Sequence, residues 1–410
     1  MIGLRKATIY LDINQKFIIF REYFLIMELS TKIFSILKNI SKKRNTQLHE
    51  PSFFGNEKKY LNECINSTFV ASNGKFNDRL EKKLKEYVNS KNVILVNSGT
   101  SALHISLIIM GVRPGDEVIL PTMTFVATAN SIKYCGAIPH FVDSENDTLG
   151  IDPFALKQWL KKIVIKKGKY SYNKLTNNKI SSIIPMHTFG HPCKIEEIVS
   201  IASEYNLKII EDSAESLGSF FKKKHTGTYG NIGIISFNGN KTITSGGGGA
   251  ILTNNNAIAN AARHLSTTAK IKHEWDFIHD KVGYNYRMAN INAAIGLAQM
   301  ENIDKIIKSK RRLFDVYERA FSNIEEIELF REPKNCKSNY WLQTIILKKK
   351  YSREKKNILK ITNDNKIMTR PVWKLLHTLK PFKKCPKSPL VNSISLEKRI
   401  INIPSSYGLS

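Results

Sequence analysis

Short apolar runs alternate with helical patterns through the middle of the chain. Between two such runs, for example, apolar residues recur at helical spacing from Ser101 to Met110. The runs are bounded by turn residues and lie at positions 93–96, 117–120, 138–142, 180–185, 207–210 and 232–237. Buried strands separated by helices are typical of a mostly parallel sheet covered on both faces, so the pattern predicts an α/β fold. In such a sheet, ligands bind at the carboxyl ends of the strands.

The first part of the chain is patterned more weakly. We predict that residues 1–50 form an N-terminal extension, with an amphipathic helix from Glu28 to Ile40 and a basic run from Ser41 to Arg44. The apolar stretch from Phe17 to Met27 is broken by two charged residues, so it is too short to span a bilayer, and no small-residue cleavage site follows it. Met27 is an alternative start of translation that the sequence leaves open.

The remaining chain divides into two predicted domains. Residues 51–290 are expected to form the large domain, in which we interpret the lysine-rich segment 160–178 as a solvated loop. Residues 291–410 are expected to form a smaller α+β domain that begins in one long helical stretch over 290–321. The same part of the chain predicts a strand at 340–347 and a helix near 353–363.

The net charge raises the question of a nucleic-acid partner. The chain has 410 residues, a formal net charge of +28 and a pI near 9.7. Its lysines are spread over almost every segment, however, and no basic stripe interleaves with stacking aromatic residues. We therefore expect an anionic small substrate rather than nucleic acid. Salt-sensitive retention on a nucleic-acid column would indicate the alternative, because phosphate contacts weaken steeply with salt.

The cysteines indicate a reducing compartment. They are five in number, show no CxxC spacing and are widely scattered, at Cys64, Cys135, Cys193, Cys336 and Cys385. This arrangement argues against a disulfide framework and against a zinc site, so we expect no metal and a cytoplasmic location.

One lysine stands out as a candidate for chemistry. Lys241 lies between two apolar runs and is followed by the glycine cluster from Gly246 to Gly249. A buried lysine loses its charge more readily, and a neutral amine can attack a carbonyl and hold it as a Schiff base. By itself, Lys241 could equally be a solvated loop lysine, so the interpretation depends on the residues at the other strand ends.

Polar and aromatic residues follow several of the predicted strands. The small residues from Asn97 to Ser101 open a helix and form a candidate anion site. Asp212 ends a buried strand, where a carboxylate requires a cation, such as a protonated pyridine nitrogen, unless it merely caps a helix. Phe125 is a candidate to stack on a planar ring, although most such aromatics are core residues. Ser236 precedes Lys241 at the end of its own strand.

Taken in order, these motifs resemble one family. The chain is similar to the DegT/DnrJ/EryC1/StrS sugar aminotransferases, which are pyridoxal-phosphate enzymes of the aspartate-aminotransferase fold. The resemblance covers residues 51–406 and rests on NSGTSAL, PTMTFVATAN, PMHTFGHP, IIEDSAESLGS, HTGTYGNIGIISFNGNK, GGGGAILTN and GYNYRMANINAAIGLAQ. Within the family, SFNGNK with four following glycines, SNYWL and MTRPVW look most like the branch of legionaminic acid biosynthesis.

The resemblance implies a role for individual residues. Lys241 would hold pyridoxal phosphate covalently, and Asp212 would pair with the ring nitrogen. The remaining cofactor contacts would come from Phe125 on the ring, from Thr100, Ser101 and Ser236 on the phosphate, and from Glu215 beside the ring. Asn285 would reach the cofactor phosphate of a neighbouring subunit, so a homodimer with shared active sites is implied. Weaker candidates for contact with the sugar nucleotide are His187, Arg287 and Arg370.

The resemblance also implies a reaction. An amino group would pass from L-glutamate to C4 of a nucleotide-linked (UDP or GDP) 4-keto-6-deoxy hexose, in the synthesis of legionaminic acid or a related surface-glycan sugar. Many relatives carry an acidic residue where Gly247 stands here, which leaves open how the sugar is held.

Three alternatives remain at this point. The same fold acts on other keto sugars, as in GDP-perosamine or dTDP-linked 3-amino sugar synthesis. A regulator that binds the cofactor without turnover, or a basic nucleic-acid-binding scaffold, would belong to another class. A nicotinamide dehydrogenase fits poorly, because no GxGxxG motif opens a helix after the first strand.

Overall fold

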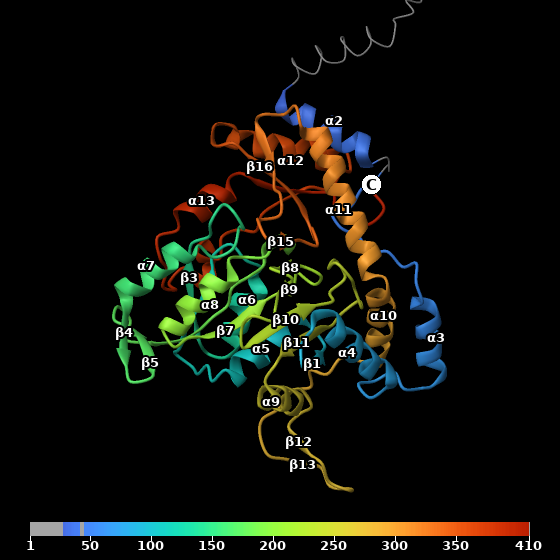
Figure 1. Cartoon of the computed structure of the whole chain (residues 1–410), viewed down its shortest axis with the longest axis vertical. Helices are drawn as coiled ribbons and strands as arrows, with labels where there is room; N and C mark the ends of the chain where they lie inside the picture. Colours follow the sequence, from blue (N-terminus) through green and yellow to red (C-terminus); the bar gives the residue numbers. More distant parts are fainter. Residues whose placement is uncertain (1–27, 42–44, 410) are drawn as a thin grey trace, which may run out of the picture.

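A nine-stranded sheet lies at the centre of the larger part of the molecule in this computed structural model, which describes residues 28–41 and 45–409 (Figure 1). Seven strands follow the main path, in the order β1 (Asn92–Val96), β11 (Gly249–Thr253), β10 (Ile232–Ser236), β7 (Lys208–Asp212), β6 (Lys179–Ile183), β2 (Glu117–Pro121) and β3 (Ile138–Val142). Of these seven, β11 alone runs antiparallel to its neighbours. The mostly parallel sheet that the apolar runs predict is therefore confirmed.

Helices cover both faces of this sheet, because each strand buries residues on alternating sides. In β1, for example, Ile94 packs on one side, whereas Val93 and Leu95 pack on the other. The first side is covered by α5 (Gly99–Ile109), α6 (Val126–Tyr134) and α9 (Asn256–Ser266). The second is covered by α3 (Glu57–Asn66), α4 (Lys75–Val88), α10 (Asn290–Glu301), α7 (Pro153–Ile163) and α8 (Ile195–Glu204).

The solvated loop predicted at 160–178 is wrong. Helix α7 continues to Ile163, and a hairpin of β4 (Val164–Lys167) and β5 (Tyr170–Asn173) joins β6 at the side of the sheet. The buried Glu117 carboxylate anchors the hairpin by accepting hydrogen bonds from Asn173 Nδ2 at 2.9 Å and from Thr176 Oγ1. The buried positions of β5 are Ser171 and Asn173. Because these inward residues are polar, no apolar alternation marks the hairpin in the sequence.

The C-terminal part forms a smaller α+β lobe around a second sheet (Figure 1). The single helix predicted over 290–321 is wrong, because the helical path breaks at Asn302, where the backbone leaves helical geometry. As a result, α10 packs on α3 and α4 of the large domain, whereas the second half of the next helix packs in the lobe. The lobe contains α11 (Ile303–Phe321), β14 (Ile327–Leu329), β16 (Gln343–Leu347), α12 (Lys355–Asp364), β17 (Arg370–Pro371), α13 (Val391–Glu397) and β18 (Ile400–Ile403).

The N-terminal helix packs on this C-terminal lobe. Helix α2 (Leu29–Ser41), predicted from its amphipathic pattern, buries Ile33 and Leu37 against α11 and against β16. Figure 1 shows α2 beside α11 and α12. The interpretations of Phe17–Met27 and of residues 42–44 lie outside the described residues. The domain limits at 50 and 290 stay a prediction.

Two small sheets complete the fold. In the first, β15 (Cys336–Lys337) of the lobe pairs with β8 (Phe220–Phe221), which pairs with β9 (Lys224–His225). The second is an arm of β12 (Lys270–Ile271) and β13 (Ile278–His279) that extends from the end of α9 at the foot of the view (Figure 1). Short 3-10 helices lie at Thr188–Gly190, Lys349–Glu354, Leu376–Thr378 and Lys380–Phe382. Among the described residues, no helix has the length and apolar character needed to cross a membrane.

A buried lysine in the lobe makes stability depend on pH. Lys310 on α11 is 0% exposed, and its ammonium donates to the carbonyl of Ser405 at 2.6 Å. Burial lowers the pKa of Lys310 from 10.5 to about 7. Between these values the unfolded chain binds more protons than the folded protein, so the free energy of unfolding rises with pH.

We expect Lys310→Met to remove this dependence. From pH 7 to pH 9.5 the free energy of unfolding of the unchanged protein should rise by about 3 kcal/mol because of Lys310. The variant should lack this rise. Urea unfolding followed by circular dichroism measures the free energy of unfolding of both proteins. Lys308→Met, at an exposed position of the same helix, is the control and should keep the unchanged slope. Parallel pH curves for K310M and the unchanged protein would show that the ammonium is not desolvated.

Candidate active site

The carboxyl ends of β1, β2, β7 and β10 meet at one edge of the sheet. After β1 the chain turns into α5, whose first turn is capped by the Ser98 hydroxyl, which accepts from the Ser101 N–H at 3.0 Å. The start of this helix lies close to the adjoining strands, because a Cβ on Gly249 would lie 2.7 Å from the Ser98 backbone. This close approach explains why a glycine follows Gly248 at the beginning of β11.

A cavity of about 310 Å³ lies at this edge. It is bounded by the start of α5, by the ends of β7 and β10, and by the segment that carries Lys241. Six of the predicted site residues line it, namely Thr100, Phe125, Asp212, Glu215, Ser236 and Lys241. These residues, from four separate stretches of the sequence, therefore meet around one space of the size of a small cofactor.

Lys241 is a largely buried residue of this cavity, with 12% of its side chain exposed. Its Nζ atom lies 3.3 Å from Glu215 Oε1 and 4.2 Å from the centre of a ring of Trp341. The alternative of a solvated loop lysine is therefore wrong. The amine lies between a carboxylate and an aromatic face at the lining of the cavity.

Asp212 provides a buried anion in the same cavity. It is 3% exposed, and its carboxylate accepts from Thr128 Oγ1 at 2.7 Å and from the Ala214 N–H at 3.2 Å. Among the described residues, no lysine, arginine or histidine forms an ion pair with it. A buried carboxylate without a cation is costly, so this site fits a positively charged ring nitrogen supplied by a ligand.

The region around the helix start fits an anion. Ser236 lines the cavity, and its hydroxyl accepts from the Asn238 N–H at 3.4 Å. Thr100 lies in the first turn of α5, where backbone N–H groups lack partners within the helix. Ser101 differs from its neighbour, because its hydroxyl donates to Asn97 Oδ1 at 2.6 Å and takes part in the cap rather than in the cavity wall.

Phe125 lies at the mouth of the cavity. It is 48% exposed, and its ring meets that of Trp373 edge to face with centroids 6.4 Å apart. It is therefore not an ordinary core residue, and one face remains available to a planar ligand.

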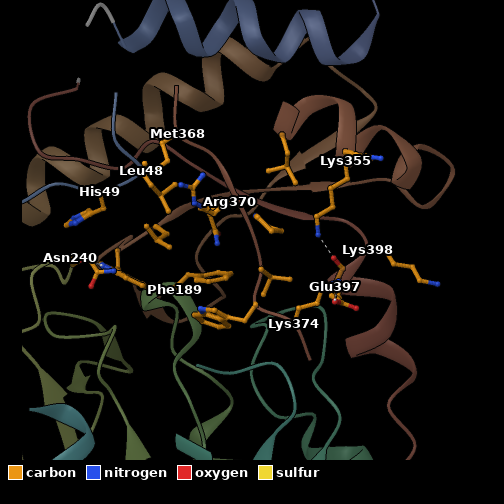
Figure 2. Close-up of a pocket in the computed structure, with 18 of the residues that line it drawn as sticks. Leu48, His49, Phe189, Asn240, Lys355, Met368, Arg370, Lys374, Glu397 and Lys398 are labelled. Atoms are coloured by element: carbon orange, nitrogen blue, oxygen red, sulfur yellow. Dashed lines mark hydrogen bonds and ion pairs between the residues drawn. The ribbon is translucent and has the colours of Figure 1, made fainter. Parts of the chain in front are cut away.

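The other four candidates lie outside the cavity wall. His187 is fully buried below it, where Nδ1 accepts from the Cys193 N–H at 3.2 Å and Nε2 lies 3.1 Å from Glu211 Oε2. Asn285 is exposed at the base of the β12–β13 arm, and Arg287 donates to Asn73 Oδ1 at 2.7 Å. Arg370 lies in a second, larger cleft (Figure 2).

The described residues contain no group of three or more histidine, cysteine, aspartate or glutamate side chains that could hold a metal ion. The hydrogen-bond partners of the buried His187, Glu211 and the Cys193 N–H, place it among the groups that support the sheet edge. Its neighbour Glu211 accepts from the backbone N–H groups of Gly227, Tyr229 and Gly230 at 2.8, 2.6 and 2.6 Å.

Comparison with known proteins identifies the family. The DegT/DnrJ/EryC1/StrS aminotransferase family matches residues 52–410. The chain belongs to the DegT/DnrJ/EryC1/StrS aminotransferase family. Its relatives include the GDP-perosamine synthase of Escherichia coli O157:H7, which is 39% identical over 88% of this chain and 94% of its own length. EpsN of Bacillus subtilis (strain 168), whose name refers to a pyridoxal phosphate-dependent aminotransferase, is 37% identical over 81% of this chain and 82% of its own.

Solved structures agree with this assignment. A DegT DnrJ EryC1 StrS aminotransferase from Brucella abortus superposes with a TM-score of 0.76 at 26% identity, covering 85% of this chain and 90% of that one. The aspartate-aminotransferase-like fold predicted from the resemblance is confirmed. The chain is a pyridoxal phosphate-dependent aminotransferase.

Several residues of this DegT-family cavity are not marked as site residues by the sequence. Thr128 supports Asp212, while Asn240, Trp341 and Trp373 line the cavity. The motifs SNYWL and MTRPVW contain the two tryptophans, but nothing in their local pattern shows that the C-terminal lobe reaches the edge of the large sheet.

Glu215 makes this DegT-family site sensitive to pH. It is 2% exposed, and Oε2 accepts from the Phe189 N–H at 3.0 Å. Burial raises the pKa of Glu215 from 4.5 to about 7, although the nearby Lys241 ammonium opposes the shift. Between these values the folded protein binds more protons than the unfolded chain, so the free energy of unfolding falls as pH rises.

We expect Glu215→Gln to relieve this cost. Both proteins are compared free of cofactor. Between pH 5 and pH 8, the free energy of unfolding of the variant should rise by about 2 kcal/mol relative to that of the unchanged protein. Urea unfolding at the two pH values measures the difference. Glu204→Gln, at an exposed position, is the control. If the free energies of unfolding of E215Q and the unchanged protein differed by the same amount at both pH values, Glu215 would be ionised throughout.

Proposed function

We propose that this aminotransferase transfers an amino group from L-glutamate to C4 of a nucleotide-linked 4-keto-6-deoxy hexose. The observation that carries the proposal is the presence of Lys241 and Asp212 in one cavity with an anion-binding helix start. Lys241 would bind the aldehyde of the cofactor, Asp212 its ring nitrogen, and the start of α5 its phosphate.

The residues of the cavity divide the work as follows. Lys241 Nζ would hold the cofactor through its aldehyde, and the same amine, when free, would carry a proton to and from the reacting carbon. Asp212, oriented by Thr128, would keep the ring nitrogen protonated, and the bound cofactor would supply an electron sink. The first turn of α5 with Thr100 and Ser236 would hold the phosphate, and Phe125 would pack on the ring.

The first candidate for the nucleotide of the substrate is GDP. Supporting this choice, the Escherichia coli relative is named GDP-perosamine synthase. The legionaminic acid route, with a UDP- or GDP-linked sugar, is the second candidate and is supported by Gly247, which lines the cavity. A Cβ at Gly247 would meet only Asn97 O, at 3.8 Å, so the missing acidic side chain leaves room for a bulkier sugar substituent.

A homodimer with shared sites is part of the proposal. Trp275 and Phe277 of the β12–β13 arm are 71% and 80% exposed, and large exposed apolar side chains mark contact surfaces. Asn285 lies at the base of the same arm.

If Asn285 completes the partner's site, co-expression of K241A and N285A subunits should restore about a quarter of the unchanged activity through mixed dimers. Two inactive subunits that stay inactive together would contradict shared sites.

The reaction itself is tested with purified protein, L-glutamate and a panel of UDP-, GDP- and dTDP-linked 4-keto and 3-keto sugars. The expected result is a glutamate-dependent loss of the visible absorbance of the lysine-bound cofactor, followed by an amino sugar identified by mass spectrometry and NMR. Glutamate that leaves the absorbance unchanged, with no product from any sugar, would contradict the proposal and favour a cofactor-binding regulator.

A further inference from the structure

A lysine-rich surface lies at one side of the large domain. Residues 157–179 include eight lysines and no aspartate or glutamate, and they form most of α7, the β4–β5 hairpin and the turn that leads into β6. Figure 1 shows the hairpin at the outer edge of the molecule, below α7. Strand β5 pairs with the first residues of β6, so the surface lies at the end of the sheet opposite the cofactor cavity.

Most of these lysines lack a carboxylate partner in the described part of the chain. Lys157 pairs with Glu204 at 3.1 Å, and Lys179 pairs with Asp116 at 2.9 Å. Within residues 28–41 and 45–409, the other six form no ion pair and are exposed, namely Lys161, Lys162, Lys166, Lys167, Lys169 and Lys174. Such a cluster of unpaired positive charges favours an extended anionic partner over a single small anion.

The hairpin also exposes apolar side chains among its lysines. The buried positions of β5 face the protein, so the residues between them belong to the outer face. On that face Ile165 lies opposite Tyr172, and Lys167 lies opposite Tyr170. Ile165 is 45% exposed, and Leu175, in the turn after β5, is 63% exposed. Aliphatic side chains next to lysines suit a membrane interface, where ammonium groups meet lipid phosphates and apolar groups enter the acyl boundary.

The aromatic rings of the hairpin are in contact with lysines. The ammonium of Lys167 lies 5.2 Å from the centre of the Tyr172 ring. Those of Lys169 and Lys179 lie 5.5 and 5.4 Å from the centre of the Tyr170 ring. Single-stranded nucleic acids bind by stacking bases on open aromatic faces, and these lysines occupy at least one face of each ring. The surface therefore suits lipid headgroups better than nucleotide bases.

A basic cleft adjoins the hairpin. It has a volume of about 910 Å³ and lies between β5 and the amino ends of β6 and β7. Its basic lining includes Arg113, Lys169 and Lys179, and among the described residues no carboxylate lines it. Tyr170 belongs both to this cleft and to the outer face of the hairpin, so the two are continuous. The cleft has room for a phosphate-containing headgroup beside the apolar contact.

We propose that the β4–β5 hairpin and its cleft dock on an anionic membrane surface. Lipid phosphates contact the lysines and the cleft, while Ile165 and Leu175 enter the boundary between headgroups and acyl chains. The cofactor cavity, at the other end of the strands, stays open to substrate. A two-fold contact with a second copy is disfavoured at this face, because it would bring two sets of unpaired lysines together. This docking needs no spanning helix and does not rest on the proposed function.

Vesicle binding by the full, cofactor-loaded chain tests the proposal. Sucrose-loaded vesicles of phosphatidylcholine, with or without an equal part of phosphatidylglycerol, are sedimented with the protein, and the bound fraction gives a partition coefficient. Binding should require phosphatidylglycerol and weaken as salt is raised. The triple variant K167Q/K169Q/K174Q should bind about 100-fold more weakly, since each lysine near an anionic surface contributes a factor of about five.

Two further variants separate this surface from the general charge of the chain. The triple variant K82Q/K83Q/K85Q removes the same charge from exposed positions of α4, on the other side of the large domain (Figure 1). It is the matched control and should bind nearly as the unchanged protein does. The double variant I165S/L175S keeps every charge and should bind about tenfold more weakly, because two apolar contacts with the bilayer are lost. Circular dichroism of each variant reports its folding.

Several results would overturn the proposal. Equal weakening by the hairpin and α4 triple variants would show that net charge alone explains the binding. Full binding by I165S/L175S would show a purely electrostatic contact, which does not select a bilayer. A protein that leaves the vesicles in solution but binds single-stranded RNA through the three hairpin lysines would assign the surface to nucleic acid instead.

Discussion

Replacing Lys241 with alanine should abolish turnover and the visible absorbance of the bound cofactor together. The variant loses both the covalent link and the amine that moves the proton, so we expect at least a 10⁴-fold fall in kcat, of which general acid–base catalysis accounts for about 10²- to 10⁴-fold. Absorbance spectra of the purified protein and single-turnover assays with L-glutamate measure the two losses.

The control for this variant is Lys208→Ala. Lys208 is an exposed lysine at the opposite end of β7 from the cavity, so its loss should leave both readouts unchanged. A K241A protein that kept its absorbance and its turnover would require another amine to hold the cofactor. No second lysine of the described residues lines the 310 Å³ cavity.

The second large effect is expected for Asp212→Asn. The amide keeps the shape of the carboxylate but cannot hold a proton on the ring nitrogen by charge, so the cofactor loses its strength as an electron sink. We expect kcat to fall by about 10²- to 10³-fold while the covalent link to Lys241 survives. Steady-state kinetics and the retained absorbance distinguish this defect from that of K241A.

Glu211→Gln provides the matched control for D212N, because the two acids are adjacent on β7. Glu211 points to the other side, where three backbone N–H groups and His187 surround its carboxylate. Its replacement should lower the free energy of unfolding by about 3 kcal/mol, with a smaller effect on kcat in the folded fraction. An unfolding midpoint lowered in D212N but not in E211Q would reverse the assignment of the two acids.

Much of the large domain could be predicted because its signals are local. The strands are short apolar runs with turn residues at their ends, and Lys241, Asp212 and Phe125 each lie within a few residues after such a run. Since parallel strands place their carboxyl ends at one edge, the sequence also predicts that these residues meet. The resemblance to the DegT family then supplied the chemistry that local patterns leave open.

The parts that were missed depend on contacts between distant residues. The β4–β5 hairpin is held by a buried polar network around Glu117, which no hydrophobic period reveals. The break at Asn302 turns the chain between α10, which packs on the large domain, and α11, whose second half packs in the lobe, although each helix continues the same helical pattern. Trp341 and Trp373 reach the cavity from the C-terminal lobe, so only the tertiary fold makes them site residues.

The packing of α2 on the C-terminal lobe has a consequence for biosynthesis. Ile33 and Leu37 leave the ribosome long before Ile401 and Ile403 of β18, which share their core. While the residues between them are being translated, the apolar side of α2 therefore lacks its native surroundings. A nascent chain cut short before β18 would present that side to other molecules, so truncated products should aggregate or occupy chaperones even where the large domain has already folded.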